Sequence, residues 1–214
     1  MNAFFPDTTL LIAFCAASAV LALTPGPAVL YIVARTLGQG RRSGFASVGG
    51  VALGNFGNAA GAALGLGALF AWSSTAFTVV KWAGALYLVW LGVQALRRPA
   101  VGLDGTAPPP DRPARVFRDG FWVALLNPKT ALFFAAFLPH FISPAASPVV
   151  QSLALGTTFV LIAASSDMAY VLLAGSIAPL LSRARGAARL GRYLSGGTYI
   201  GLGVLAALSD LRKQ

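Results

Sequence analysis

The chain has 214 residues, of which 57% are hydrophobic and only 10% are charged, and its formal net charge is +10. Soluble domains are about 45–50% apolar and about 25% charged, so this composition excludes an ordinary soluble protein. It predicts one all-α integral membrane domain over residues 1–214. The basic residues stand in the gaps between apolar runs, which argues against a nucleic-acid partner and for a lipid bilayer.

Six apolar runs are long enough to cross a hydrocarbon core of about 30 Å. In chain order, the expected transmembrane helices lie near residues 8–34, 44–71, 75–96, 120–142, 150–176 and 193–209. No Lys or Arg precedes Arg35, so the first run lacks the basic region of a signal peptide. We therefore expect this run to be retained as the first membrane helix.

Arginines are concentrated in the first, third and fifth loops, at positions Arg35, Arg41, Arg42, Arg97, Arg98, Arg112, Arg115, Arg118, Arg183, Arg185, Arg189 and Arg192. The second loop region has only Lys81, and the fourth loop has no charge. The positive-inside rule then places the odd loops in the cytoplasm. It predicts a multi-pass membrane protein with both termini on the outer side of the membrane.

The third loop, about 97–118, is rich in proline and arginine and is expected to be a cytoplasmic linker between two repeats of three helices. The first repeat covers about 8–96 and the second about 119–209. An odd number of spans per repeat gives the two repeats opposite orientations. Two motif pairs support a duplication: Thr24-Pro25 matches Asn127-Pro128, and Gly84 with Tyr87 matches Gly196 with Tyr199. The sequence thus predicts an inverted repeat.

Two short segments interrupt the first and fourth spans near their middles: Thr24-Pro25-Gly26-Pro27 and Asn127-Pro128-Lys129. An N-capping residue followed by proline starts a new helix, and inside a bilayer the freed N–H groups need partners. Paired broken helices mark the binding site of many transporters. We therefore expect helices 1 and 4 to be broken near the midplane and both segments to bind substrate. The alternative is a simple proline kink.

Lys129 and Asp167 are the only charged residues well inside the apolar runs. A charge at the bilayer centre costs roughly 2.5–3.5 kcal/mol on insertion scales, so it indicates function. The helical rise places Thr24, Asn127 and Asp167 roughly 14–16 Å from the cytoplasmic boundary, at one level. Lys129 is expected to bind a substrate carboxylate, and Asp167 to take the substrate amine or a transported proton. The alternative is a structural Lys129–Asp167 pair.

The second span carries two amides and a glycine stripe. Asn55 and Asn58 are expected either to hydrogen-bond across helices or to line a substrate cavity. The glycines recur at helical spacing, at Gly50, Gly54, Gly57, Gly61 and Gly65. Such a stripe suits close helix packing, within the monomer or at the face of a homodimer, or a sliding surface. Asp119 is interpreted as a charge at the cytoplasmic start of the fourth span.

Nearly the whole chain resembles the LysE/RhtB family of bacterial amino-acid exporters. The motifs that carry the resemblance are Thr24-Pro25-Gly26-Pro27, the glycine-rich second span, Lys81-Trp82-Ala83-Gly84-Ala85-Leu86-Tyr87-Leu88 with Leu91-Gly92, Asn127-Pro128-Lys129, Phe137-Leu138-Pro139 and the Asp167 region. The resemblance implies export of amino acids or close derivatives across the bacterial inner membrane, driven by exchange with protons; both termini are then expected in the periplasm. It does not fix the substrate.

Two other function classes remain as alternatives: a passive channel and an integral membrane enzyme. An enzyme would need clustered carboxylate, His or Cys side chains. The chain has one His, one Cys and six acidic residues, all of them Asp and scattered. No catalytic residue, metal site or cofactor is therefore expected.

Overall fold

The computed structural model describes residues 5–65, 74–97, 111–142 and 147–182, with single helical positions at 193, 197, 200, 201 and 204. Every regular element in these ranges is a helix, so the all-α prediction is confirmed for them. Most of the expected sixth span and most of the expected linker lie outside the described residues.

The first predicted span is two helices, α1 (Thr8–Leu23) and α2 (Pro27–Gln39), which meet at an angle of 48°. Asp7 caps α1 by accepting a hydrogen bond from the Leu10 N–H at 2.9 Å. The α1 helix ends at Thr24, whose backbone is extended, and α2 starts at Pro27, in the first helical position. The predicted break in the first helix is therefore present.

Glycines with left-handed backbones set both ends of α3 (Arg41–Ala63). Gly40, at φ 84°, is the only residue between α2 and α3, and Gly65, at φ 81°, follows the end of α3. Such φ values favour glycine and terminate helices. The helix therefore begins and ends before the expected limits of 44 and 71. The expected first loop was also wrong, because Arg35 is inside α2 and Arg41 inside α3.

The third predicted span is α5 (Ser74–Arg97), close to the expected 75–96. The fourth consists of α6 (Pro113–Leu125), α7 (Pro128–Leu132), a π-helical turn η1 (Phe133–Phe137) and a 3₁₀ turn η2 (Leu138–Phe141). Because Pro139 has no N–H and its ring clashes with the preceding turn, regular α-helix does not continue there. The α6 helix starts earlier than residue 120, so the end of the expected linker is helical.

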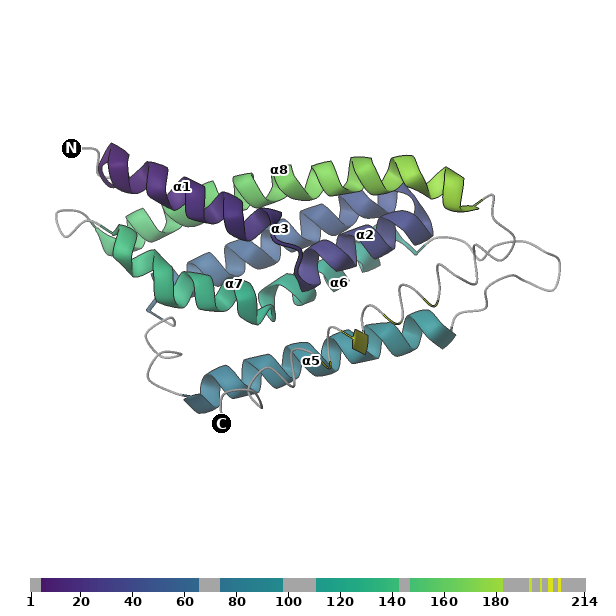
Figure 1. Cartoon of the computed structure of the whole chain (residues 1–214). Helices are drawn as coiled ribbons and strands as arrows, with labels where there is room; N and C mark the ends of the chain where they lie inside the picture. The colour runs from purple at the N-terminus through teal and green to yellow at the C-terminus, as the bar shows by residue number, and fades with distance from the viewer. Residues whose placement is uncertain are drawn as a thin grey trace.

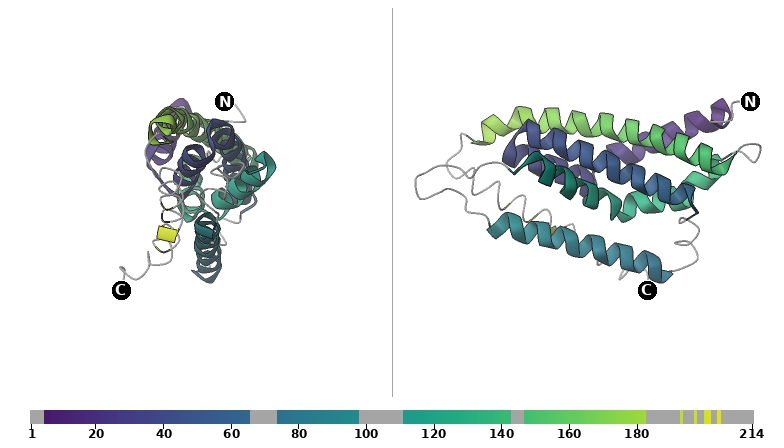
Figure 2. Two further views of the ribbon diagram at one scale, coloured as in Figure 1. Left: turned by 90° about the vertical axis from the view of Figure 1, so that its right-hand side faces the viewer. Right: turned by 180° about the vertical axis from the view of Figure 1, so that it is seen from behind.

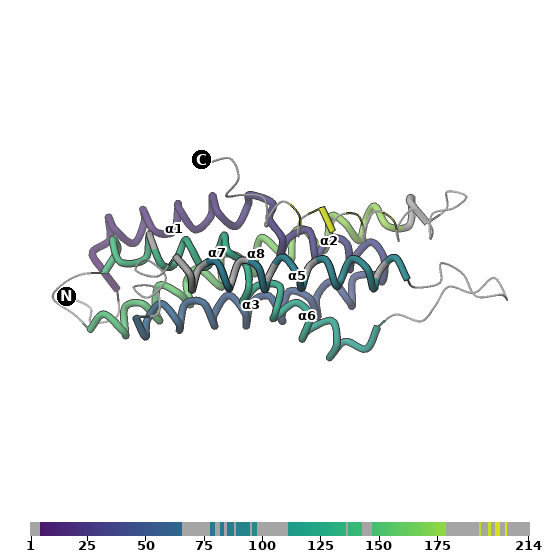
Figure 3. The backbone as a smooth tube through the Cα atoms, turned by 90° about the horizontal axis from the view of Figure 1, so that it is seen from below, coloured from purple at the N-terminus to yellow at the C-terminus, as the bar shows by residue number. Residues whose placement is uncertain are grey.

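The two broken helices run in opposite directions and break at mid-length of the bundle (Figure 1). The long helix α8 (Pro148–Ser182) extends beside both parts of the first broken helix and beside α3. The α5 helix lies apart from the bundle and touches mainly α6 and α7, as the view from behind shows (Figure 2). From below, α6 and α7 follow one another along the bundle while α1 and α2 do the same in reverse (Figure 3).

The glycine stripe of α3 lies against the backbone of α6. A Cβ at Gly50 would come within 2.0 Å of the Phe117 carbonyl oxygen, and one at Gly54 within 2.4 Å of the Phe121 oxygen. A Cβ at Gly57 would lie 2.9 Å from the Leu125 Cδ1. These three glycines therefore serve close helix packing within the monomer, one of the alternatives left open by the sequence. The α3 and α6 helices form a closely packed pair.

Two buried apolar clusters form the core on either side of the helix breaks. The first joins α2, α3, α6 and α8 with Leu91 of α5; its buried members are Tyr31, Ile32, Val48, Val51, Leu91, Val123, Ala124 and Val171. The second, rich in phenylalanine, contains Phe14, Ala22, Ala59, Phe133, Phe134, Leu138, Leu155, Phe159 and Ala163. We call them the aliphatic cluster and the phenylalanine cluster.

The outer surface is also apolar, as a bilayer requires. Exposed large side chains include Ile12, Val20, Leu53, Leu64, Leu86, Leu161, Leu173 and Ile177. By length and hydropathy, Pro148–Ala178 of α8 qualifies as a membrane span, and the bent pair α1 and α2 qualifies as a second. These two candidate spans are counted only over the described ranges of the chain.

Candidate functional site

A small cavity of about 40 Å³ lies where the helices break, between the aliphatic and phenylalanine clusters. Its walls come from the α1–α2 break, α3, α7 and α8; they are lined by Leu21, Ala22, Thr24, Gly26, Ala28, Val29, Asn55, Asn127, Lys129, Thr130, Phe159, Ala163 and Asp167. Six of the residues expected from sequence share this cavity. The expected Pro25, Pro27, Pro128 and Asn58 are not among its lining residues.

The Lys129 side chain crosses from α7 to the end of α1. Its ammonium donates to the Leu21 carbonyl oxygen at 2.8 Å and to the Thr24 carbonyl oxygen at 2.5 Å. The last carbonyls of a helix carry partial negative charge and lack partners within the helix, so a cation stabilises them. The stem passes Gly26 closely: a Cβ there would lie 3.2 Å from the Lys129 Cδ. Gly26 thus provides room for the lysine.

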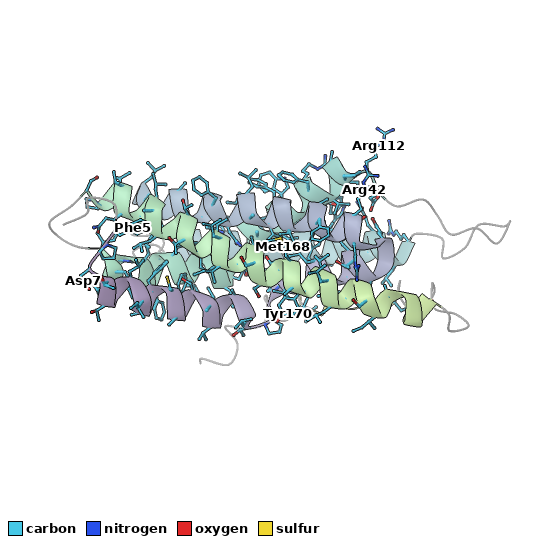
Figure 4. All side chains as sticks on the ribbon, turned by 90° about the horizontal axis from the view of Figure 1, so that it is seen from above. Phe5, Asp7, Arg42, Arg112, Met168 and Tyr170 are labelled. Atoms are coloured by element: carbon cyan, nitrogen blue, oxygen red, sulfur yellow. The ribbon has the colours of Figure 1, made fainter. Side chains whose placement is uncertain are left out.

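Two side chains of α8 complete the cap on α1. The Tyr170 hydroxyl donates to the Leu23 carbonyl oxygen at 3.0 Å, and the Ser166 hydroxyl lies 3.5 Å from the Ala22 carbonyl oxygen. Figure 4 shows Tyr170 on the side of α8 that faces the end of α1. Neither residue was expected from the sequence, because hydroxyls on an apolar helix give no signal of a distant partner. The carbonyl end of the break is therefore satisfied by protein groups.

The amide end of the same break is uncapped. The N-cap of α2 is Gly26, which has no side chain to accept from the first N–H groups. Ala28 and Val29, in the first turn of α2, line the cavity. A helix N-terminus presents free N–H donors and partial positive charge, so this side of the cavity favours an anionic group.

Asp167 and Asn55 are buried acceptors on the cavity wall. Each residue is only 5% exposed. No hydrogen bond or ion pair joins the Asp167 carboxylate to another group in the described part of the chain, although the charge of Lys129 acts on it. The Asn55 Oδ1 likewise has no hydrogen-bond partner there. A buried polar group without a partner costs about 1–3 kcal/mol, which indicates a ligand or water site.

The second break is capped from within its own chain segment. The Asn127 Oδ1 accepts a hydrogen bond from the Lys129 N–H at 3.1 Å, and Asn127 is 4% exposed. Asn58 also has a structural contact, since its Nδ2 donates to the Ala124 carbonyl oxygen of α6 at 2.9 Å. For Asn58, the alternative of a hydrogen bond across helices is the one observed.

A second polar cluster, which we call the Arg35 network, lies beyond the aliphatic cluster. The Arg35 guanidinium bonds Asp111 at 2.5 Å and Asp119 at 2.9 Å, and the Tyr87 hydroxyl lies 3.3 Å from the Asp119 Oδ1. Gln39 Nε2 donates to Asp111 at 2.9 Å. Asp119 is 1% exposed, so its interpretation as a helix-start charge was wrong: α6 starts earlier and turns this residue inward.

The Arg35 network joins α2, α5 and α6 at the end of the molecule where Arg42 and Arg112 also lie; Asp7 lies at the opposite end (Figure 4). In the described ranges, no three His, Cys, Asp or Glu side chains lie close enough to hold a metal ion.

A family model described as "LysE type translocator" matches residues 19–210. The chain belongs to the LysE family. It is thus a membrane protein related to translocators, and the resemblance seen in its motifs is confirmed. No solved structure matches the chain.

Named relatives of this LysE-family protein are efflux proteins. It is 36% identical over 167 residues to the homoserine/homoserine lactone efflux protein of Salmonella typhimurium, covering 78% of this chain and 81% of the relative. It is 29% identical to the leucine efflux protein of Enterobacter sp., covering 85% and 87%. An uncharacterized membrane protein of Vibrio cholerae is 32% identical, covering 94% and 98%.

Proposed function

We propose that this LysE-family protein is a secondary active exporter of amino acids or close derivatives across the bacterial inner membrane, and that proton entry drives it. The family and the relatives named for efflux of homoserine, homoserine lactone and leucine support the substrate class. An α-ammonium is the charged group that these solutes have in common. The proposal therefore requires a site that recognises this group.

The cavity at the helix breaks has the chemistry for such a solute. The observation that carries the proposal is the unpaired, buried Asp167 carboxylate in the same cavity as the uncapped start of α2. An acceptor of negative charge suits an ammonium, and free N–H donors suit a carboxylate. The other walls, including Ala22, Val29 and Phe159, are apolar and suit an uncharged side chain.

The volume of about 40 Å³ holds only a few water molecules, so the cavity must widen to take an amino acid. Its position between two packed clusters fits alternating access better than a passive channel, which would need a continuous path. The alternative of a channel remains the one that the experiment must exclude.

The proposed topology has six spans, as two inverted repeats, with both termini in the periplasm. The opposite directions of the α1–α2 and α6–α7 pairs support it (Figure 1). So does the grouping of arginines in the sequence within 35–42, 97–118 and 183–192. In this orientation the Arg35 network lies on the cytoplasmic side of the cavity.

Asp167 is the proposed site of proton coupling. Inward movement of a proton releases about 2.3 kcal/mol per 100 mV of membrane potential, which can drive export against a gradient. Asp167 is the carboxyl group that lines the cavity. A carboxylate that alternately holds a proton and faces the substrate links the two fluxes.

The test uses everted membrane vesicles, whose lumen corresponds to the periplasm. With an acidic lumen, the wild type should accumulate radiolabelled leucine or homoserine, and Asp167→Asn should not accumulate either. Asp7→Asn is the matched control, because Asn also caps a helix and Asp7 lies outside the cavity. Flux that is unaffected by the pH gradient would identify a channel, and accumulation by Asp167→Asn would contradict the coupling role.

A further inference from the structure

Asn55 is held at a fixed place on the cavity wall. It lies in α3 directly after Gly54, whose missing side chain brings α3 against the α6 backbone. Three residues further on, the Asn58 amide is bound to the Ala124 carbonyl oxygen of α6. These two contacts fix the rotation of α3 about its axis. Asn55 therefore faces the cavity because its helix is fixed on both sides of it.

The Oδ1 atom of Asn55 has no partner among the described residues that would compensate for its burial. The residue is 95% buried, and its Oδ1 accepts no hydrogen bond from any described group. Lys129, the nearby cation, already donates to the Leu21 and Thr24 carbonyls. An unsatisfied acceptor in an apolar surrounding is complementary to a ligand donor.

Asp167, on α8, lines the same small cavity and also lacks a hydrogen bond within the described ranges. Two separate helices thus bring residues with unpaired acceptors to the wall of one cavity of about 40 Å³. A primary ammonium carries three N–H donors and one positive charge, so a single group can serve both acceptors.

We propose that Asn55 Oδ1 and the Asp167 carboxylate together bind the ammonium of the substrate, and that Asn55 selects solutes with a primary amine. This inference rests on the proposed function and assigns a role to one more residue of the same site. The primary amine then defines the substrate class, and the carboxylate of the substrate lies at the start of α2.

The two acceptors differ in how they respond to pH. A proton on Asp167 removes the charge that attracts the ammonium, so proton and substrate compete for this carboxylate. Asn55 does not titrate. Loss of Asn55 should therefore weaken substrate binding while the pH dependence of that binding stays the same, a separation that a merely structural role would not give.

The experiment measures exchange of leucine and of homoserine in proteoliposomes that contain purified full-length protein. Asn55→Leu, which keeps the side-chain size and removes the acceptor, should raise the KM about tenfold or more, as loss of a hydrogen bond to a charged group does. Its pH profile should match the wild type. The α-hydroxy acid counterpart of leucine should inhibit Asn55→Leu and the wild type equally, since it lacks the ammonium.

Asn55→Asp decides which part of the substrate Asn55 contacts. It retains an acceptor and adds negative charge, so an ammonium should bind at least as tightly as in the wild type. A carboxylate contacted through Nδ2 would instead be repelled, and a raised KM for Asn55→Asp would overturn the inference. This variant remains informative if Asn55→Leu fails to fold.

Ser47→Ala is the matched control on the same helix. It removes a hydrogen bond to the Ser43 carbonyl oxygen within α3, outside the cavity lining, and should leave the KM unchanged. If Asn55→Leu has an unchanged KM for leucine and normal proton-driven export, the inferred role of Asn55 is overturned and the proposed function still stands. Absence of any amino-acid exchange by the wild type would overturn the proposed function itself.

Discussion

The two helix breaks differ in where their polar groups find partners. At the first break, the carbonyl end of α1 receives donors from Lys129, Ser166 and Tyr170 of the other half of the chain. The amide end, at Gly26, has no side-chain cap. At the second break, Asn127 caps the new helix itself. The first break is therefore open on its donor side, and the second is closed.

This difference assigns distinct roles to two segments whose sequences match. The second break supplies Lys129, which reaches the first break and stabilises the end of α1. The first break then presents its amide donors to the cavity. A capping residue at Gly26 would satisfy those donors locally, and its Cβ would also approach the Lys129 stem. Glycine at the first break thus suits the proposed binding role, and asparagine at the second break stabilises the start of α7.

The largest effect is expected from Lys129→Met. The substitution removes the charged donor to the Leu21 and Thr24 carbonyls and leaves the Asp167 charge uncompensated. Because bonds to charged groups are worth about 1.5–3 kcal/mol, the folded protein should lose about 2 kcal/mol or more. A thermal-shift measurement in detergent, together with the amount of protein in membranes, checks this.

The double variant Lys129→Met with Asp167→Asn separates structure from coupling. If the two charges formed only a structural pair, removal of both should restore proton-driven export. The contacts argue against restoration, because Met cannot replace the donor to the α1 carbonyls and Asn cannot carry the proton. Robust pH-driven export by the double variant would therefore rule out the coupling role of Asp167.

An intermediate effect is expected from the prolines, and it should be unequal. Pro25 lies between the end of α1 and the cap of α2, where about 3 kcal/mol opposes a continuous helix. Pro25→Ala removes one of the two prolines that oppose a continuous helix, while Pro27 still starts α2, so the break becomes less fixed and export should fall while membrane expression stays normal. In Pro128→Ala, the Asn127 cap remains, and only about 0.4–1 kcal/mol of stability should be lost.

Export rates and expression levels of the two proline variants provide the comparison. Equal losses of export would show that both breaks bind substrate in the same way. Wild-type export by both variants would contradict the hypothesis that the breaks form the site.

The sequence predicted the features that depend on neighbouring residues. Thr24 and Asn127 before prolines located both breaks, because helix capping is local chemistry. Counting helical rise brought Thr24, Asn127 and Asp167 to one level, and all three line the cavity. Lys129 was expected to bind a substrate carboxylate; it lines the same cavity, but its ammonium donates to α1 carbonyls, and these contacts depend on how distant helices approach each other.

Long-range partners were beyond the sequence signals. Arg35 and Asp119 were assigned to loop and helix-start positions, whereas the structure buries them as a pair. Their pairing depends on α2 and α6 lying together, and nothing in the spacing encodes that. Tyr170 and Ser166 were missed for the same reason. The end of α3 depends on a left-handed Gly65 that could not be distinguished from the other glycines of the stripe.

The smallest effect tests the closed break directly. Asn127→Ala removes the acceptor for the Lys129 N–H and should cost about 1 kcal/mol of stability, whereas Asn127→Gly should cost only a few tenths. Glycine makes the second break resemble the first, since Gly26 also lacks a cap. Thermal unfolding of both variants in lipid nanodiscs gives the comparison. Equal losses for Ala and Gly would mean that Asn127 acts through its packing in the cavity wall. A smaller loss of stability for Asn127→Gly, with amino-acid exchange retained, would show that the second break tolerates an uncapped helix start, as the first break does. The Asn127 cap would then support the helix without binding the substrate.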